Sequence, residues 1–263
     1  MTGSNRFDDA AFPIVVAHRG ASSTHPENTL EAFEAAVALG AQVVELDVRL
    51  SSDGVPVVMH DPDVSRTTEG VGLVHEMRAE ELTALRARGG SARAQVPTLP
   101  QALSLLSGRS GVAIEIKNLP GDPAYDPDHE SIAEAALDEV SACSFEGPVL
   151  VVSFNPRSIA FARGAAASGI VTGLLITDAV APDDGLAHVV EHGHDLLLPG
   201  SRGLVATGAR FVERAHGAGV RVGTWTVDDA DRFAMLLGWG VDAVATNDPA
   251  MGLAALARHR DGD

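Results

Sequence analysis

The sequence predicts an α/β protein whose parallel strands close into a (β/α)8 barrel of the TIM type. The chain has 263 residues, close to the roughly 250 residues typical of such a barrel. Short apolar runs alternate with helical patterns, which is typical of βαβ units around a parallel sheet. Charged residues and histidines recur where the early runs end, and the carboxyl ends of barrel strands meet at one mouth. We therefore expect one barrel domain over residues 1–263.

The first half of the chain contains three strand-like runs and a short companion strand. The runs are Ile14–Ala17, Val43–Val48 and Val112–Ile116, and the companion is Val55–Met59. Helical spacing of apolar residues covers Asn28–Leu39, Ala79–Arg86 and Leu99–Leu106. The stretch 61–96 is the longest departure from strict alternation, and it predicts a small insertion after the second strand.

The second half continues the alternation after a loop at Pro120–Pro127. Five apolar runs follow at Val149–Val152, Val171–Ile176, Leu196–Leu198, Val220–Trp225 and Val241–Ala245. Helical patterns lie around Ile159, Val189, Phe211 and Phe233, and after Pro249. With the companion set aside, eight strands result. A doubly wound open sheet is the alternative, but it would usually carry a glycine-rich dinucleotide turn after its first strand. His-Arg-Gly-Ala-Ser-Ser is not that turn, which favours the barrel.

Composition excludes several classes of partner. The formal net charge of −17 opposes binding to nucleic acid and to anionic membrane surfaces. No apolar run reaches the roughly 18 residues that a membrane-spanning helix needs, so we expect no membrane span. A lone cysteine, Cys143, excludes an intramolecular disulfide and a cysteine-based zinc cluster. Met1 to Ala10 lacks the basic region of a signal peptide, and we expect a cytoplasmic protein.

Three carboxylates form the candidate metal site. Glu45 and Asp47 lie two residues apart on one strand, so both side chains point to the same face. Glu115 ends the next strand and can converge on them. Carboxylates so close together repel unless one is protonated or a cation lies between them. Oxygen ligands without thiolate suit Mg²⁺ or Ca²⁺ better than zinc. The alternative is simple pairing of Glu45 or Glu115 with Arg19, Arg49 or Lys117.

Two cations and two histidines complete the candidate site. Lys117 shares a face with Glu115 and could hold a phosphate oxygen, or it could form only an ion pair inside the barrel. Arg19 suits bidentate binding of phosphate. His18 and His60 each close an apolar run, and as a pair they fit a general acid and a general base. The remaining histidines, His188, His192 and His194 among them, are expected at the surface.

Taken in order, the motifs of this chain resemble those of the glycerophosphodiester phosphodiesterase family. They are His-Arg-Gly, Pro-Glu-Asn-Thr, Glu-Leu-Asp-Val, His-Asp-Pro, Arg-Thr-Thr, Val-Pro-Thr-Leu, Glu-Ile-Lys and Trp-Thr-Val. Each motif alone is weak, but the ordered set extends from about Ile14 to Pro249 and is highly specific. The resemblance implies a catalytic barrel that hydrolyses glycerophosphodiesters, which are small molecules, to sn-glycerol 3-phosphate and an alcohol.

The resemblance also implies a role for each candidate residue. Glu45, Asp47 and Glu115 match the ligands of one divalent cation, Mg²⁺ or Ca²⁺ with Mn²⁺ possible. His18 and His60 match the acid/base pair, and Arg19 and Lys117 the phosphate-binding groups. Trp225 matches an aromatic wall near the glycerol, and Glu27 a residue that orients the first histidine or arginine.

Two departures from the family pattern are Asp228, where Asn is frequent, and Asn247, where Asp is frequent. We expect both to affect only the outer pocket and to leave the chemistry intact. Two other functions stay open. A lysophospholipase D would need an apolar groove, for which the insertion offers Leu73, Val74, Met77, Leu82 and Leu85. A catalytically silent, phosphate-binding barrel should have lost at least one of the expected site residues, and none is missing here.

Overall fold

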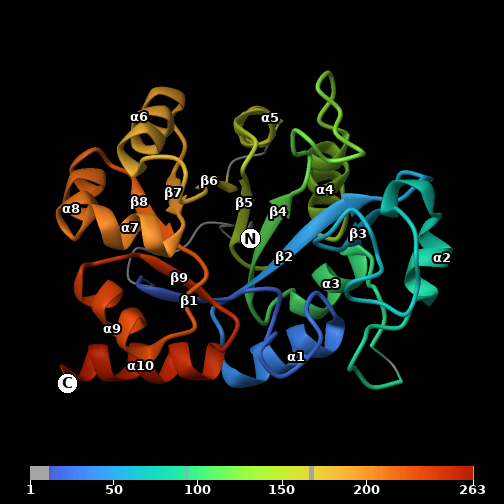
Figure 1. The fold of residues 1–263 in the computed structure, drawn as a ribbon, viewed down its shortest axis with the longest axis horizontal. Helices are drawn as coiled ribbons and strands as arrows, with labels where there is room; N and C mark the ends of the chain where they lie inside the picture. The colour runs from blue at the N-terminus through green and yellow to red at the C-terminus, as the bar shows by residue number, and fades with distance from the viewer. Residues whose placement is uncertain (1–11, 93, 166–168, 263) are drawn as a thin grey trace.

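The computed structural model describes residues 12–92, 94–165 and 169–262, and it contains the barrel that the sequence predicts (Figure 1). The segment Met1 to Ala10, on which the expected absence of a signal peptide rests, lies outside the described residues. Among the described residues, no helix is both long and apolar enough to cross a membrane. Cys143 is a free, exposed cysteine at the end of a surface helix.

Eight parallel strands in the described part of the chain form one closed sheet in the order β1-β9-β8-β7-β6-β5-β4-β2, with β2 pairing back to β1. A ninth strand, β3, runs antiparallel to the end of β2 and is the companion that the sequence predicts. The strands are β1 Ile14–Ala17, β2 Val43–Leu50, β3 Pro56–Val58, β4 Gly111–Ile116, β5 Val149–Ser153, β6 Val171–Ile176, β7 Leu196–Pro199, β8 Arg221–Thr224 and β9 Ala243–Thr246.

Helices cover the outside of the barrel (Figure 1). They are α1 Leu30–Leu39, α2 Ala79–Ala84, α3 Leu99–Leu106, α4 Ser131–Ala142, α5 Pro156–Ala165, α6 Pro182–His192, α7 Ser201–Thr207, α8 Arg210–Gly217, α9 Ala230–Gly238 and α10 Pro249–Asp261. The sequence prediction omitted α4 and α7. Half of the buried residues of α4 are alanine, and α7 is short and contains Gly203, so both have a weak apolar signal.

Period-2 alternation along the strands separates two apolar layers. One set of side chains points outward and packs under the helices. The other set points into the barrel, where Ile14, Val16, Val43, Leu150 and Leu196 belong to one buried cluster. The inward positions on β2 and β4 then become charged toward the carboxyl ends of these strands. The barrel interior is therefore apolar at its base and on the β5–β9 side, and charged at the mouth beside β1, β2 and β4.

The segment 61–96 leaves the strand–helix alternation, as the sequence predicts, and contains a short 3-10 helix at Val74–Glu76 followed by α2. Most of its apolar side chains pack together. Val74 and Leu82 are fully buried with Val57 and Val96, and Met77 and Leu85 pack against the same cluster. The insertion therefore has its own small core, which uses most of the apolar side chains that a lysophospholipase D would need for a groove there.

One histidine expected at the surface is buried. His194 is only 4% exposed, because the chain turns back at Gly193 after α6 and places residue 194 beneath the last helical turn. His188 is half-buried and His192 is exposed, so the expectation is wrong for His194 and partly wrong for His188.

Candidate active site

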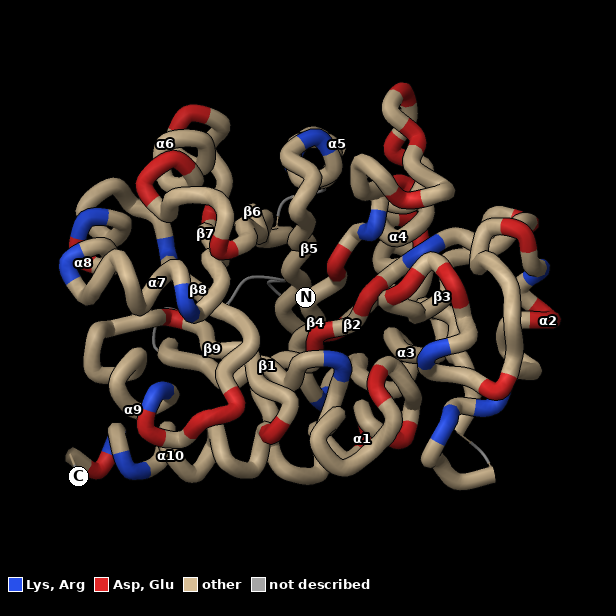
Figure 2. Tube along the Cα trace, in the orientation of Figure 1, with Lys and Arg blue, Asp and Glu red and all other residues tan. Residues whose placement is uncertain are grey.

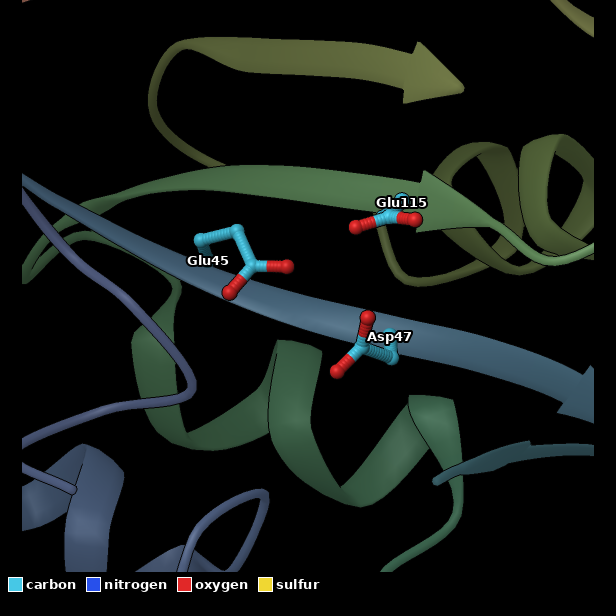
Figure 3. Close-up of side chains that lie close together, drawn as sticks. All are labelled: Glu45, Asp47 and Glu115. Carbon is cyan, nitrogen blue, oxygen red and sulfur yellow. The ribbon is translucent and has the colours of Figure 1, made fainter. Parts of the chain in front are cut away.

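The three carboxylates converge inside the barrel mouth (Figure 3). Asp47 on β2 lies directly opposite Glu115 on β4 in the parallel ladder, and Glu45 precedes Asp47 on the same inner face. All three side chains are buried, and each offers an oxygen atom within 4.8 Å of the others. The geometry of this acidic triad is thus set by strand register, because a one-residue slip would turn the carboxylates out of the barrel.

Burial and mutual repulsion control the charges of the triad. Burial, followed by the negative charge of Asp47, raises the pKa of Glu45 to about 8. Burial also raises the pKa of Glu115 to about 7, although Lys117 acts in the opposite direction. Asp47 differs, because the positive charges of Lys117 and Arg19 outweigh its burial and hold its pKa well below the usual value. Without a cation, burial and mutual repulsion therefore favour proton binding by Glu45 and Glu115 over proton binding by Asp47.

Lys117 and Arg19 lie directly against the triad. The Lys117 ammonium is 2.8 Å from Asp47 Oδ1 and also pairs with Glu115. Arg19 donates its backbone N–H to Glu45 Oε2 at 2.8 Å, and its Nε lies 3.1 Å from Asp47 Oδ2. Lys117 thus does form the predicted ion pair, whereas Arg49 turns away and pairs with Asp122 at 2.7 Å.

The turn after β1 requires unusual backbone angles. Arg19 has a φ of 57° and Gly20 a φ of 84°, both in the left-handed region. A Cβ atom on Gly20 would lie 2.6 Å from the backbone carbon of Ala32 on α1, so no larger residue fits. This close contact holds His18 and Arg19 at the mouth of the barrel rather than on the outer loop.

The donor set of the triad fits a divalent cation. Glu45 Oε1 is buried and has no hydrogen-bond partner among the residues that the structure describes. A buried carboxylate oxygen without a partner is costly. A hard cation bound by carboxylate oxygens from all three residues would satisfy that atom and displace the protons from Glu45 and Glu115. The acidic triad can therefore hold a divalent cation.

His18 is held in one tautomer by Asn247. The His18 Nδ1 atom lies 2.8 Å from Asn247 Oδ1, and the Asn247 amide Nδ2 donates to Asp228 Oδ2 at 2.6 Å. Because a carboxylate only accepts, the Asn247 oxygen must face His18, and Nδ1 must carry the proton. The free lone pair of His18 is then on Nε2. Burial, followed by the charge of Arg19, lowers the pKa of His18, which favours the neutral imidazole.

His60 is held by Asp61 in the way that His18 is held by Asn247. Its Nδ1 atom lies 2.6 Å from Asp61 Oδ1, and Asp61 also binds Arg66 from the insertion. Burial opposes ionisation of Asp61, but its bonds to Arg66 and His60 lower its pKa to about 2. Asp61 is thus an acceptor at neutral pH, and the lone pair of His60 is on Nε2. Burial also lowers the pKa of His60.

Glu27 connects the two halves of this polar network. Its carboxylate accepts from Arg19 Nη1 at 2.8 Å and from both terminal nitrogens of Arg66 at 2.8 and 2.9 Å. The sequence predicts that Glu27 orients the first histidine or arginine, and the contact is with Arg19. Because Arg66 also binds Asp61, Glu27 joins the arginine beside the triad to the carboxylate that supports His60.

An apolar wall faces the charged groups across a cavity of about 210 Å³. Trp225 lies in this wall, donates its indole N–H to Leu198 O at 3.0 Å, and meets Phe154 edge to face with ring centroids 5.2 Å apart. The cavity is lined on the polar side by His18, Arg19, Glu45, His60, Glu115 and Lys117, and on the apolar side by Leu150, Val152, Phe154, Leu175, Leu198 and Trp225. All candidate site residues therefore lie at this cavity or, like Asp47 and Glu27, bind residues that line it.

Five residues that support the site were not predicted as site residues. They are Asn28, which donates to Asp47 Oδ2 at 2.7 Å, and Asp61, Arg66, Asp228 and Asn247. The expectation that Asp228 and Asn247 affect only the outer pocket is wrong, because Asn247 contacts His18 and Asp228 holds Asn247. Asn247 continues the inner face of β9, two residues after Ala245, so period-2 alternation was the signal that could have found it.

Comparisons with known proteins agree over nearly the whole chain. Residues 18–251 match the model of the glycerophosphoryl diester phosphodiesterase family. A glycerophosphodiester phosphodiesterase of Caldanaerobacter subterraneus subsp. tengcongensis is 34% identical over 241 residues, covering 90% of this chain and 94% of the relative. A glycerophosphodiester phosphodiesterase of Bacillus altitudinis is 31% identical over 246 residues, with 89% and 94% covered.

A solved structure is also similar to this chain over nearly its whole length. The phosphodiesterase of Oleispira antarctica, determined in complex with the product sn-glycerol-3-phosphate, superposes with a TM-score of 0.82 at 27% identity, covering 94% of this chain and 98% of that protein. A closed parallel barrel with its polar residues gathered at the carboxyl-terminal mouth defines this chain as a TIM-barrel enzyme. The chain belongs to the glycerophosphoryl diester phosphodiesterase family.

Proposed function

We propose that this protein hydrolyses glycerophosphodiesters to sn-glycerol 3-phosphate and an alcohol. The observation that carries the proposal is a pair of imidazoles, each held in one tautomer, at a cavity shared with a buried cluster of carboxylates and cations. The related enzymes are named for this reaction, and the Oleispira antarctica phosphodiesterase was determined with that product. A cavity of about 210 Å³ suits a small substrate.

Arg19 and Lys117 are the groups that we assign to the phosphate. The phosphate of a phosphodiester carries one negative charge on two non-bridging oxygens. Arg19 and Lys117 lie against the triad and line the cavity, so both can bind these oxygens. Glu45, Asp47 and Glu115 would hold one divalent cation, Mg²⁺ or Ca²⁺, with Mn²⁺ a further candidate. When bound, the cation would supply further positive charge to the phosphate oxygens.

His18 and His60 are the groups that we assign to proton transfer. Each has its Nδ1 proton bound to an oxygen, so Nε2 of one histidine can remove a proton from the attacking oxygen. The other histidine, in its protonated form, would give a proton to the departing alcohol oxygen. The attacker is either water or the neighbouring hydroxyl of the glycerol, the latter giving a cyclic phosphate.

The apolar wall favours a second candidate function. Leu150, Leu175 and Leu198 are apolar and line the same cavity as the charged groups. A lysophospholipase D acting on single-chain lipids would place apolar groups there instead of at the insertion, where most apolar side chains pack into a small core. The cavity volume is small for an acyl chain, which favours the water-soluble glycerophosphodiester.

The test compares release of glycerol 3-phosphate from glycerophosphocholine and glycerophosphoethanolamine with release of lysophosphatidic acid from lysophosphatidylcholine. Each substrate is measured with Mg²⁺, Ca²⁺ or Mn²⁺ and with EDTA. We expect metal-dependent turnover of the glycerophosphodiesters and little turnover of the lipid. A strong preference for the lipid would favour the second function, and no turnover of any substrate would indicate a silent, phosphate-binding barrel.

A further inference from the structure

Arg49 is a buried cation to which the proposed reaction gives no role. It follows Asp47 by two residues on β2 and is only 5% exposed. A charged side chain is rarely buried unless it is paired. Nη1 of Arg49 lies 2.7 Å from Asp122 Oδ2, and Nε donates to the backbone oxygen of His60 at 2.8 Å. One guanidinium therefore contacts both the β4–α4 loop and the segment that carries His60.

His60 lies outside the sheet. β3 ends two residues before it, and the N–H of Met59 still donates to Asp47 O at 2.9 Å. At His60 itself the contact with β2 changes from backbone to side chain, because the carbonyl of His60 accepts from Arg49 Nε. The position of the His60 backbone relative to the acidic triad therefore depends on Arg49.

The bond between His60 and Asp61 cannot replace this contact. These two residues are adjacent, so the bond orients the imidazole ring without anchoring the segment that carries both of them. Asp61 binds Arg66 in turn, but Arg66 belongs to the insertion. Arg49 differs because it is buried on a barrel strand, and strands hold functional groups more precisely than loops do.

Asp122 holds the guanidinium from a loop that is itself ordered. The side chain of buried Asn118 accepts from the N–H of Asp126 at 3.0 Å, and it donates to the carbonyl oxygens of Asp126 and His129 at 3.0 and 3.3 Å. Because Asn118 directly follows Lys117, these bonds close the loop beside a cation that we assign to the phosphate. The pair of Arg49 and Asp122 thus joins this loop to the backbone of His60.

We propose that Arg49 is a positioning residue that holds His60 in place for proton transfer, and that Asp122 orients its guanidinium. This inference rests on the proposed function. Arg49 is not among the residues that line the cavity of about 210 Å³ beside the triad, so it acts through His60 and not on the substrate. It lines a separate cavity of about 250 Å³ between the insertion and the β4–α4 loop. The planar fork of arginine suits two partners at once.

The first experiment is a double-mutant cycle with glycerophosphocholine as substrate. We expect Arg49→Ala to lower kcat about 10- to 100-fold with little change in KM, because a displacement of about 1 Å can cost this much. In the His60→Ala protein, the same substitution should change kcat less than about twofold, since no imidazole is left to position. A fall of equal size in both proteins would indicate a general loss of structure and would overturn the proposal.

Two further variants keep the cycle interpretable. Arg109→Ala is the matched control, because Arg109 also pairs with a carboxylate, Glu34 at 2.8 Å, but at the opposite end of β4. It should leave kcat unchanged. Asp122→Ala removes the partner of Arg49 at a half-buried loop position, where folding is less at risk. It should lower kcat less than Arg49→Ala does, and again only while His60 is present. Circular dichroism and thermal unfolding verify that each variant folds.

A second experiment follows His60 without using activity. In the full chain with labelled histidines and with Mg²⁺ present, the NMR signal of the His60 ring is identified by its loss in His60→Gln. We expect Arg49→Ala to shift or broaden this signal. The signal of His216, which pairs with Asp242 at 2.7 Å at the other end of the barrel, should not change.

The two experiments separate this inference from the proposed function. Absence of turnover in the unmodified protein would contradict the proposed function, and the NMR comparison would still decide whether Arg49 holds His60. An unchanged His60 signal in Arg49→Ala would overturn the inference, whatever the substrate of the enzyme.

Discussion

His18 and Asn247 are hydrogen-bonded because β1 and β9 are neighbours in the closed barrel. Ala17 pairs with Thr246 in the parallel ladder, so the next residue of each strand continues its inner face. The result is the 2.8 Å contact between His18 Nδ1 and Asn247 Oδ1. Asp228, which binds both the N–H and the side-chain amide of Asn247, then determines which side of that amide faces the histidine.

Replacement of Asn247 by leucine should lower kcat about 100-fold with little change in KM, because small displacements of a catalytic group have effects of this size. Asn247→Asp should restore activity only when it is combined with Asp228→Asn, because a carboxylate at position 247 would repel Asp228, whereas the exchanged pair keeps both the donor and the oxygen that accepts from His18 Nδ1. Steady-state kinetics on glycerophosphocholine provide the measurement. Ser22→Ala is the control, because Ser22 donates to the same Asn247 oxygen without contacting the imidazole. An unchanged kcat in Asn247→Leu would show that this contact does not orient His18.

Removal of either catalytic imidazole should lower turnover strongly. We expect His18→Ala and His60→Ala each to lower kcat by roughly 10²–10⁴, the usual contribution of general acid–base catalysis. Asp61→Asn should have a smaller effect, because the amide can still accept from His60. His259→Ala, at an exposed histidine in the last turn of α10, serves as the control. If both alanine variants kept full turnover, our assignment of proton transfer to these residues would be wrong.

Metal binding should stabilise the folded protein through the acidic triad. At a cation concentration 100 times Kd, the expected gain is about 2.7 kcal/mol, or roughly 5–10 °C in melting temperature for a chain of this size. Glu115→Gln should remove most of that rise, and Glu213→Gln, at an exposed surface carboxylate, should leave it intact. Thermal unfolding with EDTA and with added Mg²⁺ or Ca²⁺ measures the effect. An equal rise in Glu115→Gln would place the ion elsewhere.

The stability of the metal-free protein should fall with acid partly because of His194. Burial, followed by the positive charge of Arg163, lowers its pKa to about 4 in the folded state, below the ordinary histidine value near 6.5, so the unfolded chain binds the proton first. The folding stability that depends on neutral His194 is therefore fully present above pH 6.5, and it is lost progressively as the pH falls to about 4. We expect a loss on the order of 2 kcal/mol from this group.

Denaturant unfolding in EDTA at pH 7.5 and 4.5 tests this dependence. The loss of stability between these two pH values should be smaller in His194→Asn than in the unmodified protein, because asparagine does not titrate. The same loss in both proteins would mean that other groups account for the whole acid sensitivity. His259→Ala again controls for removal of an exposed histidine.

Gly20 should tolerate no substitution. Alanine there would combine a left-handed φ with a clash against the backbone of Ala32, and we expect a loss of at least about 2 kcal/mol. Gly217→Ala is the matched control, because a Cβ atom at Gly217 meets nothing within 4 Å. Urea denaturation of both variants measures the difference. A Gly20→Ala protein as stable as Gly217→Ala would show that the turn after β1 can relax.

The barrel and the convergence of the acidic triad could be predicted from sequence because they depend on local alternation. Glu45 and Asp47 share a face whatever the rest of the chain does, and parallel strands bring their carboxyl ends together. The contact of His18 with Asn247 depends instead on closure between the first and last strands, 229 residues apart. No local pattern contains that information. Arg66 reaches Glu27 from an insertion whose path follows no barrel periodicity.

His194 was misjudged for a related reason. A histidine after a helical run resembles a surface residue, and its burial follows from the left-handed turn at Gly193. Helix α4 was missed because half of its buried positions are alanine, which contributes little to an apolar pattern. In both cases the structure depends on how a short segment packs against the barrel, and this packing cannot be predicted from composition alone.

Charged residues lie on β2 and β4, whereas β5 has none (Figure 2). The resulting division of the barrel interior into a charged half and an apolar half has an evolutionary consequence. Nearly all the groups that we assign to phosphate binding and proton transfer come from β1, β2, β4 and the segments that follow β3 and β9, whereas Leu150, Leu175 and Leu198 come from β5, β6 and β7. Substitutions on the second set reshape the cavity and leave the electrostatics of the first set unchanged. New leaving groups can therefore be selected in descendants of this barrel while the hydrolytic chemistry is inherited intact.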